Sequence, residues 1–394
     1  MSDQEEFYRI KKLPPYVFEE VNSLKARLRQ EGRDIIDLGM GNPDMPTPSH
    51  IVDKLTETAR NPKAHRYSAS RGIPGLRKAM GRYYQRRFNV ALDPDTQIIA
   101  TLGSKEGFAN LAQAITAPGD VILSPNPAYP IHAYGFIIAG GVIRPVPALS
   151  PEAYLKGLHD ALQSPANPVK AMVINYPSNP TAQIVGLDFY KEIVALAKRK
   201  EVLVLSDLAY SEIYFDETRP PPSIFEVDGA IDIAVEVNSL SKTFAMAGWR
   251  VGMAVGNERM IKALARVKSY LDYGAFTPIQ VAAAAALDGP WQCVEDIRAI
   301  YKSRRDVLIT QFSQAGWDIP VPEASMFAWA EIPEPMKQLG SVAFAKKLME
   351  EADVAVAPGL GFGEFGDGHV RIGLVENEQR IRQAARNIKR LMSQ

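Results

Sequence analysis

Cysteine is almost absent from this sequence, and neither sign of charge is in excess. Cys293 is the only cysteine among 394 residues, which excludes an intrachain disulfide and a cluster of thiolate metal ligands. The 45 lysine and arginine residues balance the 45 aspartate and glutamate residues. This balance argues against a nucleic-acid-binding surface, because such surfaces carry an excess of basic side chains.

Long apolar runs are missing as well. No segment approaches the ~20 apolar residues that a membrane-spanning helix needs. Met1 to Lys12 mixes acidic and basic side chains where a secretory signal would have an apolar core. We therefore expect a cytoplasmic protein with neither nucleic acid nor membrane as a partner, which leaves a small charged metabolite as the ligand.

The length and the hydrophobic pattern predict an α/β protein. A chain of 394 residues suffices for a large domain and a smaller one. Short apolar runs alternate with helical segments, and this alternation predicts a mainly parallel sheet with crossover helices. The strand-like runs lie at 98–101, 121–124, 171–175, 202–205, 231–237 and 251–255. Later runs at 326–330, 354–357 and 370–373 predict a smaller α+β part.

The segment from Asn238 to Gly252 contains the most informative lysine. Strand-like runs precede and follow it, so we expect Lys242 on a connecting loop rather than on a helix. A lysine attacks carbonyl groups only when burial or neighbouring cations lower its pKa. Ser239, Ser241 and Arg250 are close in sequence and are donors that suit a phosphate. Most lysines lie on the surface, but a lysine among phosphate donors indicates pyridoxal phosphate.

A second anion-binding segment follows the strand-like run at 98–101. Gly103 opens a predicted helix there, and the N–H groups at a helix N-terminus attract anions. Ser104 and Lys105 are therefore a second candidate phosphate anchor. Glycines also flank Met40 in the turn that ends at Asp44, where a backbone without side chains can approach a ligand closely.

Taken together, these segments resemble the class I and II aminotransferases, which are pyridoxal phosphate enzymes of fold type I. The matching motifs cover essentially the whole chain: Gly41 to Asp44, Tyr67 to Arg77, Gly103 to Gly107, Asn179 to Ala182, Asp207 to Tyr210, Asn238 to Gly252 and His369 to Gly373. One departure is Ala182, where the family pattern Asn-Pro-Thr-Gly has glycine, and we expect a small change of the loop there. Within the family, the sequence is most similar to bacterial glutamate-pyruvate (alanine) aminotransferases and the related LL-diaminopimelate aminotransferases.

The resemblance implies a fold and a division of the chain. The large domain is expected to contain a mainly parallel seven-stranded sheet sandwiched by helices, and the smaller domain to be α+β. We expect residues 1–44 to form an N-terminal arm and part of the small domain. Residues 45–287 would form the large cofactor-binding domain, and residues 288–394 the small C-terminal domain.

The resemblance also implies roles around the cofactor. Lys242 would bond to pyridoxal phosphate and later move the substrate's α-proton. Asp207 would keep the ring nitrogen protonated, which the chemistry requires because only the protonated ring withdraws electrons well. Asn179 and Tyr210 would contact the ring oxygen, and Tyr129 would stack on the ring.

Further roles concern the substrate and a second subunit. The resemblance implies that Arg371 binds the substrate α-carboxylate beside Gly41, since a planar guanidinium suits a carboxylate. Tyr67 would reach the phosphate of the neighbouring subunit, so a homodimer with active sites at its interface is expected. His132 follows Tyr129 at the family's spacing, and both a supporting role and a purely structural one stay open.

The implied activity is ping-pong transfer of an amino group between an L-amino acid and a 2-oxo acid. The substrates indicated are alanine with 2-oxoglutarate and, in reverse, glutamate with pyruvate. The same chemistry would serve aspartate, aromatic amino acids or LL-diaminopimelate, and a pyridoxal phosphate β-lyase would use the same lysine. A cofactor-sensing regulator is disfavoured, because neither end of the sequence shows a basic DNA-binding segment.

Overall fold

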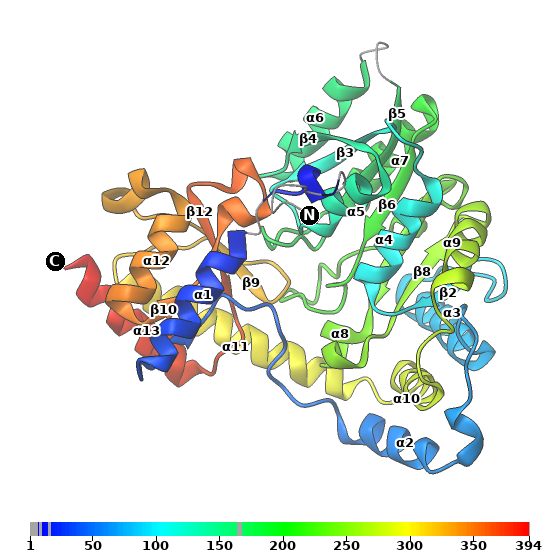
Figure 1. The fold of residues 1–394 in the computed structure, drawn as a ribbon, viewed down its shortest axis with the longest axis horizontal. Helices are drawn as coiled ribbons and strands as arrows, with labels where there is room; N and C mark the ends of the chain where they lie inside the picture. Colours follow the sequence, from blue (N-terminus) through cyan, green and yellow to red (C-terminus); the bar gives the residue numbers. More distant parts are fainter. Residues whose placement is uncertain (1–6, 8–9, 15–16, 164–167, 394) are drawn as a thin grey trace.

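A computed structural model describes residues 7, 10–14, 17–163 and 168–393 (Figure 1). The remaining residues of the expected N-terminal arm, 1–6, 8–9 and 15–16, lie outside the described part. The helices are α1 (Val17–Gln30), α2 (Ser49–Ala59), α3 (Pro74–Phe88), α4 (Ser104–Ile115), α5 (Ile131–Ala139), α6 (Pro151–Gln163), α7 (Leu187–Lys200), α8 (Leu240–Thr243), α9 (Glu258–Leu271), α10 (Thr277–Asp288), α11 (Gln292–Gln314), α12 (Gly340–Ala352) and α13 (Glu378–Met392). The strands are β1 (Ile36–Asp37), β2 (Ile98–Thr101), β3 (Val121–Asn126), β4 (Val142–Pro147), β5 (Val169–Asn175), β6 (Leu203–Asp207), β7 (Ala234–Ser239), β8 (Gly252–Gly256), β9 (Phe327–Glu331), β10 (Val354–Ala355), β11 (Ala357–Pro358) and β12 (His369–Gly373).

A seven-stranded sheet forms the centre of the larger part. Its strand order is β2-β8-β7-β6-β5-β3-β4. The pairs from β7 through β4 are parallel, whereas β8 runs antiparallel to both of its neighbours. The expected mainly parallel seven-stranded sheet is therefore confirmed. Parallel strands place their carboxyl ends at one edge, which is where α/β sheets bind ligands.

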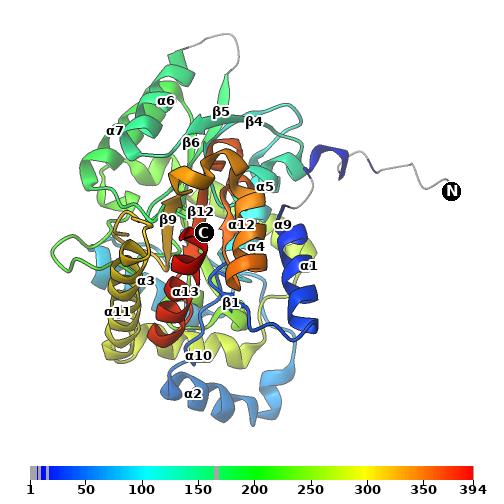
Figure 2. The same cartoon turned by 90° about the vertical axis from the view of Figure 1, so that its left-hand side faces the viewer.

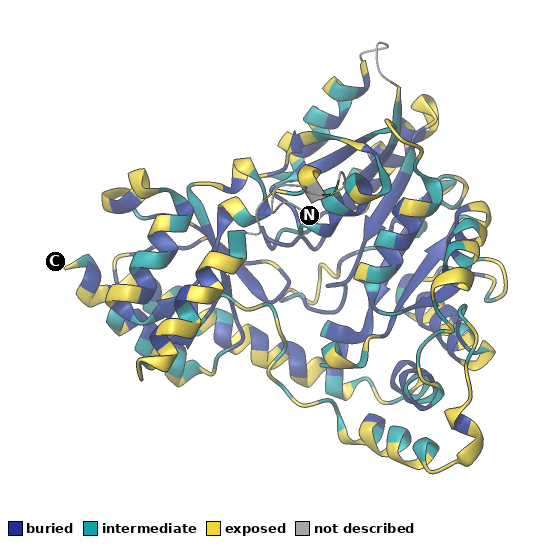
Figure 3. Cartoon of the chain, viewed as in Figure 1, coloured by how far each residue is buried: buried dark blue, intermediate teal, exposed yellow. Residues whose placement is uncertain are grey.

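Helices cover both faces of this sheet because successive strand residues point to opposite sides. Ile99, Val173 and Leu205 pack with α4, α5 and α9 on one face. On the other face Ile98 packs with α3 and α10, and Val204 packs with α6 and α7. The central strands are almost entirely buried, and the outward faces of the helices are exposed (Figure 3).

The smaller part lies beside the sheet and is built from both ends of the chain (Figure 2). Strands β11, β12 and β9 form an antiparallel sheet, and β1 pairs in parallel with β10. Helices α11, α12 and α13 share one apolar core with these strands, and the long helix α11 reaches from this core toward the large sheet (Figure 1). The division of the chain near residues 44 and 287 stays a prediction.

Two features differ from the sequence-based expectation. Strand β4 was not predicted, because its residues Val142–Pro147 include two prolines; an edge strand tolerates them, since proline need not donate to a neighbour. The expected loop position of Lys242 is wrong, because the residue lies in the one-turn helix α8. The Ser239 side chain caps this turn by accepting a hydrogen bond of 3.1 Å from the Ser241 N–H.

Candidate active site

A cavity of about 440 Å³ lies at the carboxyl ends of the parallel strands, against the smaller part. It gathers all the candidate residues that the sequence indicated except Tyr67. Those lining it are Gly41, Ser104, Lys105, Tyr129, Asn179, Asp207, Tyr210, Ser239, Ser241, Lys242, Arg250 and Arg371. They come from segments far apart in the sequence, so the fold assembles a single polar site.

Lys242 lies in this cavity with its amine directed at the backbone of the Gly41 turn. The Nζ atom donates a hydrogen bond of 2.6 Å to the Gly41 carbonyl oxygen. Burial, aided by the positive charges of Arg371 and Arg250, lowers the pKa of Lys242 to about 7. The amine is therefore available in its neutral, nucleophilic form near neutral pH.

One end of the cavity is rich in donors for an anion. Arg250, in a left-handed backbone conformation, donates to the carbonyl oxygens of Ala247 at 2.7 Å and Leu102 at 3.2 Å. Helix α4 begins beside it at Ser104, after Gly103 with a φ of +86°. A Cβ atom at Gly103 would lie 2.2 Å from Arg250 Nη2, so only glycine permits this approach of guanidinium and helix N-terminus.

A buried carboxylate belongs to another wall of the cavity. Asp207 ends β6 with its Oδ2 atom 2.9 Å from His132 Nε2, and both residues are buried. Asp207 Oδ1 also accepts a hydrogen bond from the Ala209 N–H at 3.2 Å. His132 thus contacts a candidate catalytic residue, which favours the supporting role that the sequence left open.

Arg371, on strand β12, is contributed to the site by the smaller part. Its Nη1 atom donates to Asn179 Oδ1 at 2.8 Å, and its Nη2 atom donates to the Gly39 carbonyl oxygen at 3.3 Å. Its guanidinium lies 3.9 Å from the centre of the Phe327 ring. A Cβ atom at Gly41 would be 3.4 Å from Arg371 Nη2, so the glycine turn and the arginine lie side by side.

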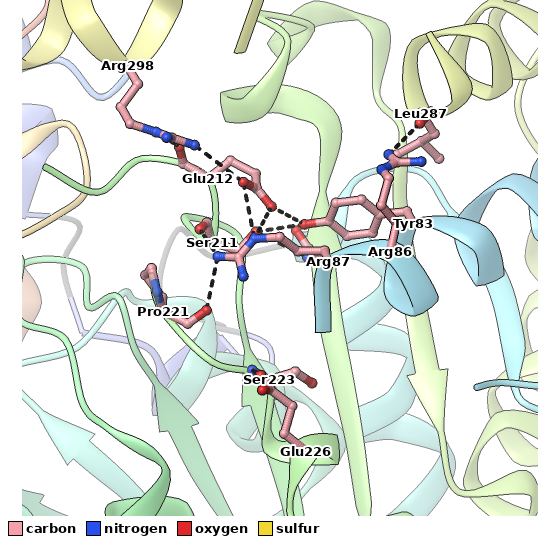
Figure 4. A network of polar contacts seen from close by, with 11 residues as sticks. Tyr83, Arg86, Arg87, Ser211, Glu212, Pro221, Ser223, Glu226, Leu287 and Arg298 are labelled. Atoms are coloured by element: carbon pink, nitrogen blue, oxygen red, sulfur yellow. Dashed lines mark hydrogen bonds and ion pairs between the residues drawn. The ribbon is translucent and has the colours of Figure 1, made fainter. Parts of the chain in front are cut away.

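Tyr210 lines the cavity. The residues that directly follow it belong to a buried ionic network around Glu212 (Figure 4). Burial raises the pKa of the Tyr210 hydroxyl well above its usual range, so this hydroxyl stays protonated. Two residues later, Glu212 accepts hydrogen bonds from Tyr83 at 2.6 Å and Arg87 at 3.2 Å. Arg298 of α11 donates to the Glu212 carbonyl oxygen at 3.1 Å. The network therefore fixes the Tyr210 segment to α3 and to α11.

Tyr67 lies away from the cavity. Its side chain is 86% exposed, and its ring stands 4.7 Å from the ring of Tyr273. It is not among the described residues that line the cavity. The expectation that it serves a neighbouring subunit stays a prediction.

The sequence reasoning missed several residues of the site. Asn175 ends β5, donates to the Asp207 carbonyl oxygen at 2.9 Å and accepts from the Asn179 N–H at 3.0 Å. A polar residue that ends a buried parallel strand was the available signal. Phe327 and Met40 also line the cavity, but nothing in the pattern distinguishes an apolar residue of a site from one of the core.

The donor set fits pyridoxal phosphate. Arg250, the serines and the α4 N-terminus offer charge-assisted and backbone hydrogen bonds for a phosphate. Asp207 offers a buried carboxylate for a protonated ring nitrogen, and Lys242 offers a neutral amine for an aldehyde. All of these groups line the same cavity.

Such a site on such a fold is typical of a pyridoxal phosphate enzyme, and the family comparison identifies the class as an aminotransferase. The chain belongs to the family described as aminotransferase class I and II, whose model matches residues 33–388. Enzymes of this family depend on pyridoxal phosphate and act on amino acids and 2-oxo acids. The expected family is thereby confirmed.

Individual relatives cover nearly the whole chain. It is 63% identical to the "Putative aminotransferase AatC" of Rhizobium meliloti, covering 99% of this chain and 96% of that one. It is 54% identical to the glutamate-pyruvate aminotransferase AlaC of Escherichia coli (97% and 93% covered) and 40% identical to the LL-diaminopimelate aminotransferase of Moorella thermoacetica (98% of each).

The solved structures agree on the fold. Substrate-bound BacF of Bacillus subtilis superposes with a TM-score of 0.92 at 35% identity, covering 98% of each chain. An aspartate aminotransferase double mutant of Thermus thermophilus gives a TM-score of 0.90 at 28% identity, covering 98% of this chain and all of that one. The expected fold type I architecture is therefore confirmed.

Proposed function

We propose that this aminotransferase exchanges an amino group between alanine and 2-oxoglutarate, forming pyruvate and glutamate, with pyridoxal phosphate bound in the cavity around Lys242. The observation that carries the proposal is the Lys242 amine, whose pKa is lowered to about 7 between an anion-binding end and Arg371. The substrate pair is supported by the 54% identity to a glutamate-pyruvate aminotransferase over nearly the whole chain.

Different residues of the cavity would bind the phosphate and the ring of the cofactor. Ser104, Lys105, Ser239, Ser241 and Arg250 would hold the phosphate, because they supply hydroxyl, ammonium and guanidinium donors in one place. The rest of the set would contact the ring: Tyr129 would stack on its face, Asp207 would bind its nitrogen, and Asn179 and Tyr210 would bind its oxygen. When bound, pyridoxal phosphate supplies an aldehyde for the amine and a ring that withdraws electrons.

The chain's own residues then orient the substrate and move a proton. Arg371 binds the α-carboxylate through paired donors, and the Gly41 turn fixes the position of that carboxylate. Lys242 Nζ accepts the proton from the substrate α-carbon and then donates it to a different carbon atom. A group whose pKa lies near the working pH is suited to this role. Asp207 would place its carboxylate at the ring nitrogen and hold a proton there.

We also propose a cytoplasmic homodimer. Tyr67, Tyr270, Tyr273 and Phe276 are exposed large side chains on two segments that meet at the Tyr67–Tyr273 ring contact. Exposed apolar clusters of this kind mark protein interfaces. No helix among the described residues is long and apolar enough to cross a membrane.

The decisive experiment is an absorbance titration of the purified, cofactor-loaded protein with single amino acids in the absence of an oxo acid. Alanine and glutamate should each abolish the visible band of the bound cofactor and raise the near-ultraviolet band of its aminated form. Aspartate, phenylalanine and LL-diaminopimelate are the comparison donors.

The outcomes separate the alternatives. If only LL-diaminopimelate or aspartate converts the bound cofactor, the proposed substrate pair is wrong, but the enzyme is still an aminotransferase. Release of ammonia and pyruvate would indicate a β-lyase. A protein that binds no pyridoxal phosphate at all would overturn the proposed site.

A further inference from the structure

A second cavity of about 250 Å³ adjoins the active site beneath helix α1. The two cavities share Met40, Gly41, Tyr129 and Arg371 as lining residues. Because Arg371 lines both, a substrate whose α-carboxylate lies on this arginine is bound at the junction of the two cavities. We name the second cavity the side-chain chamber.

The lining of the side-chain chamber changes from apolar to charged. Phe18, Val21 and Phe362 contribute apolar surface. Asn22, Lys25 and Asp37 contribute polar groups, and Lys25 Nζ lies 2.7 Å from Asp37 Oδ2. The side chains of this ion pair are only 11% exposed. An ion pair with so little exposure keeps much of its electrostatic strength, because solvent screens it poorly.

Two cations of α1 lie beside one carboxylate at the side-chain chamber. Arg29 Nη2 approaches the same Asp37 oxygen at 3.6 Å, although Arg29 does not line the space. Of these two cations, Lys25 is therefore the one that a ligand in the chamber can contact.

A continuous chain of contacts joins Arg371 to Lys25. Arg371 Nη2 donates to the Gly39 carbonyl oxygen, the Gly39 N–H donates to Asp37 Oδ1 at 3.1 Å, and Asp37 Oδ2 accepts from Lys25. Both backbone contacts belong to Gly39, so one glycine and one carboxylate side chain connect the two cations. A five-carbon dicarboxylate with a hydrogen bond at each end spans roughly 10 Å, so one such ligand can contact two cations at opposite ends of a small cavity.

We propose that the side-chain chamber receives the side chain of glutamate and 2-oxoglutarate, and that Lys25 binds the distal carboxylate. This assignment rests on the proposed transamination and adds the residue that distinguishes its two substrates. The methylene groups would lie against the apolar lining, and Asp37 would hold the Lys25 ammonium toward the chamber. Alanine and pyruvate are too short to reach Lys25, so their binding would not depend on it.

The test compares two ligands on the cofactor-loaded enzyme. The dissociation constants of glutarate, a dicarboxylate, and of butyrate, a monocarboxylate, are measured by calorimetry for the wild type and for Lys25→Gln. Loss of one charge-assisted hydrogen bond should raise the dissociation constant of glutarate about 10- to 100-fold and leave that of butyrate unchanged. The KM for 2-oxoglutarate should rise in parallel, while the KM for pyruvate stays constant.

Two variants keep the test decisive. Arg29→Gln removes a cation that approaches the same carboxylate from outside the side-chain chamber and should leave the glutarate affinity within about twofold. Lys25→Arg retains a cation and should restore most of the affinity even if Lys25→Gln is unstable.

The failure of this assignment differs from a failure of the proposed function. Equal weakening of both ligands, no effect on glutarate, or a selective loss of LL-diaminopimelate would overturn the role of Lys25. A wild-type enzyme that turns over neither alanine nor glutamate would instead overturn the proposed substrates.

Discussion

The amine of Lys242 donates a hydrogen bond of 2.6 Å to the carbonyl oxygen of Gly41, a residue 201 positions earlier in the chain. The turn that begins at Gly39 also accepts a hydrogen bond from Arg371. One short backbone segment thus contacts the proposed base and the proposed carboxylate-binding residue. Any change that shifts this turn should affect both the chemistry and the binding of substrate.

Replacing Lys242 should abolish turnover without unfolding the protein. In Lys242→Ala no amine is left to bond to the cofactor or to move the proton, and kcat should fall by about 10⁴-fold or more. Lys242→Arg should be equally inactive, because an arginine stays protonated at neutral pH. Lys105→Ala is the matched control and should weaken cofactor binding without abolishing the reaction. Rapid turnover by either Lys242 variant would contradict the mechanism.

The lowered pKa of Lys242 predicts how cofactor binding depends on pH. In the cofactor-free protein the rate of pyridoxal phosphate incorporation should rise with pH up to about 7 and then level off, since only the neutral amine reacts. Arg371→Leu removes one of the charges that lower this pKa, so the midpoint should move to higher pH. Stopped-flow absorbance measures both profiles. Identical midpoints in the two proteins would exclude the electrostatic influence of Arg371.

The same titration has a consequence for folding. The unfolded lysine keeps its proton up to about pH 10.4, so above about pH 7 the unfolded state binds more protons than the folded state. The free energy of unfolding of the cofactor-free protein should therefore rise with pH between these values, relative to Lys242→Ala. Urea unfolding at several pH values measures this difference.

Gly103→Ala should selectively impair the anion-binding end. The new Cβ atom would lie 2.2 Å from Arg250 Nη2 and force the guanidinium away from the α4 N-terminus. Gly119→Ala is a matched control, because Gly119 has a nearly identical φ of +88° and no heavy atom within 4 Å of the added carbon. Both variants should lose about 1–2 kcal/mol of stability from backbone strain. Only Gly103→Ala should show a higher dissociation constant for pyridoxal phosphate.

Asp44→Asn should raise the KM for the amino acid. Arg304 of α11 holds Asp44 through two hydrogen bonds of 2.7 Å and also donates to the Leu374 carbonyl oxygen. The pair therefore connects the Gly41 turn to the strand that carries Arg371. We expect a KM about tenfold higher and a stability loss of about 1–2 kcal/mol.

Asp288→Asn is the control for that experiment. It disrupts an equally bidentate but exposed pair with Arg82 and should change stability by less than about 1 kcal/mol. Comparable effects of the two substitutions on KM would argue against a role of Asp44 in positioning the turn.

Glu212→Gln should destabilise the protein strongly. Its carboxylate is 1% exposed and neutralises Arg87 and Arg298, which would be left with less compensated charge in a buried site. We expect a loss of about 3 kcal/mol by urea unfolding. Tyr83→Phe removes one neutral hydroxyl, which bonds to Glu212 and Ser211, and should cost about 1.5 kcal/mol. Glu57→Gln, at an exposed pair with Lys54, should change stability by less than about 0.5 kcal/mol.

The sequence by itself determined the parts of the molecule that depend on local pattern. Buried strands such as β2 and β5 appear as short apolar runs, whereas the roles of Asp207 and Asn179 followed from the resemblance to the family. The Lys242 segment carries its serines and Arg250 within a few residues, so the anion-binding chemistry could be predicted directly. The prolines of β4 and the capped turn of α8 misled the local interpretation.

The tertiary structure decided every contact between distant segments. The Lys242–Gly41, Asp207–His132 and Arg371–Asn179 hydrogen bonds join residues 201, 75 and 192 positions apart. The ionic network of Glu212 and the side-chain chamber at Lys25 likewise combine helices and loops that no periodicity relates. Such contacts depend on how the elements pack, because a hydrophobic pattern specifies which face of an element is buried but not which partner covers it.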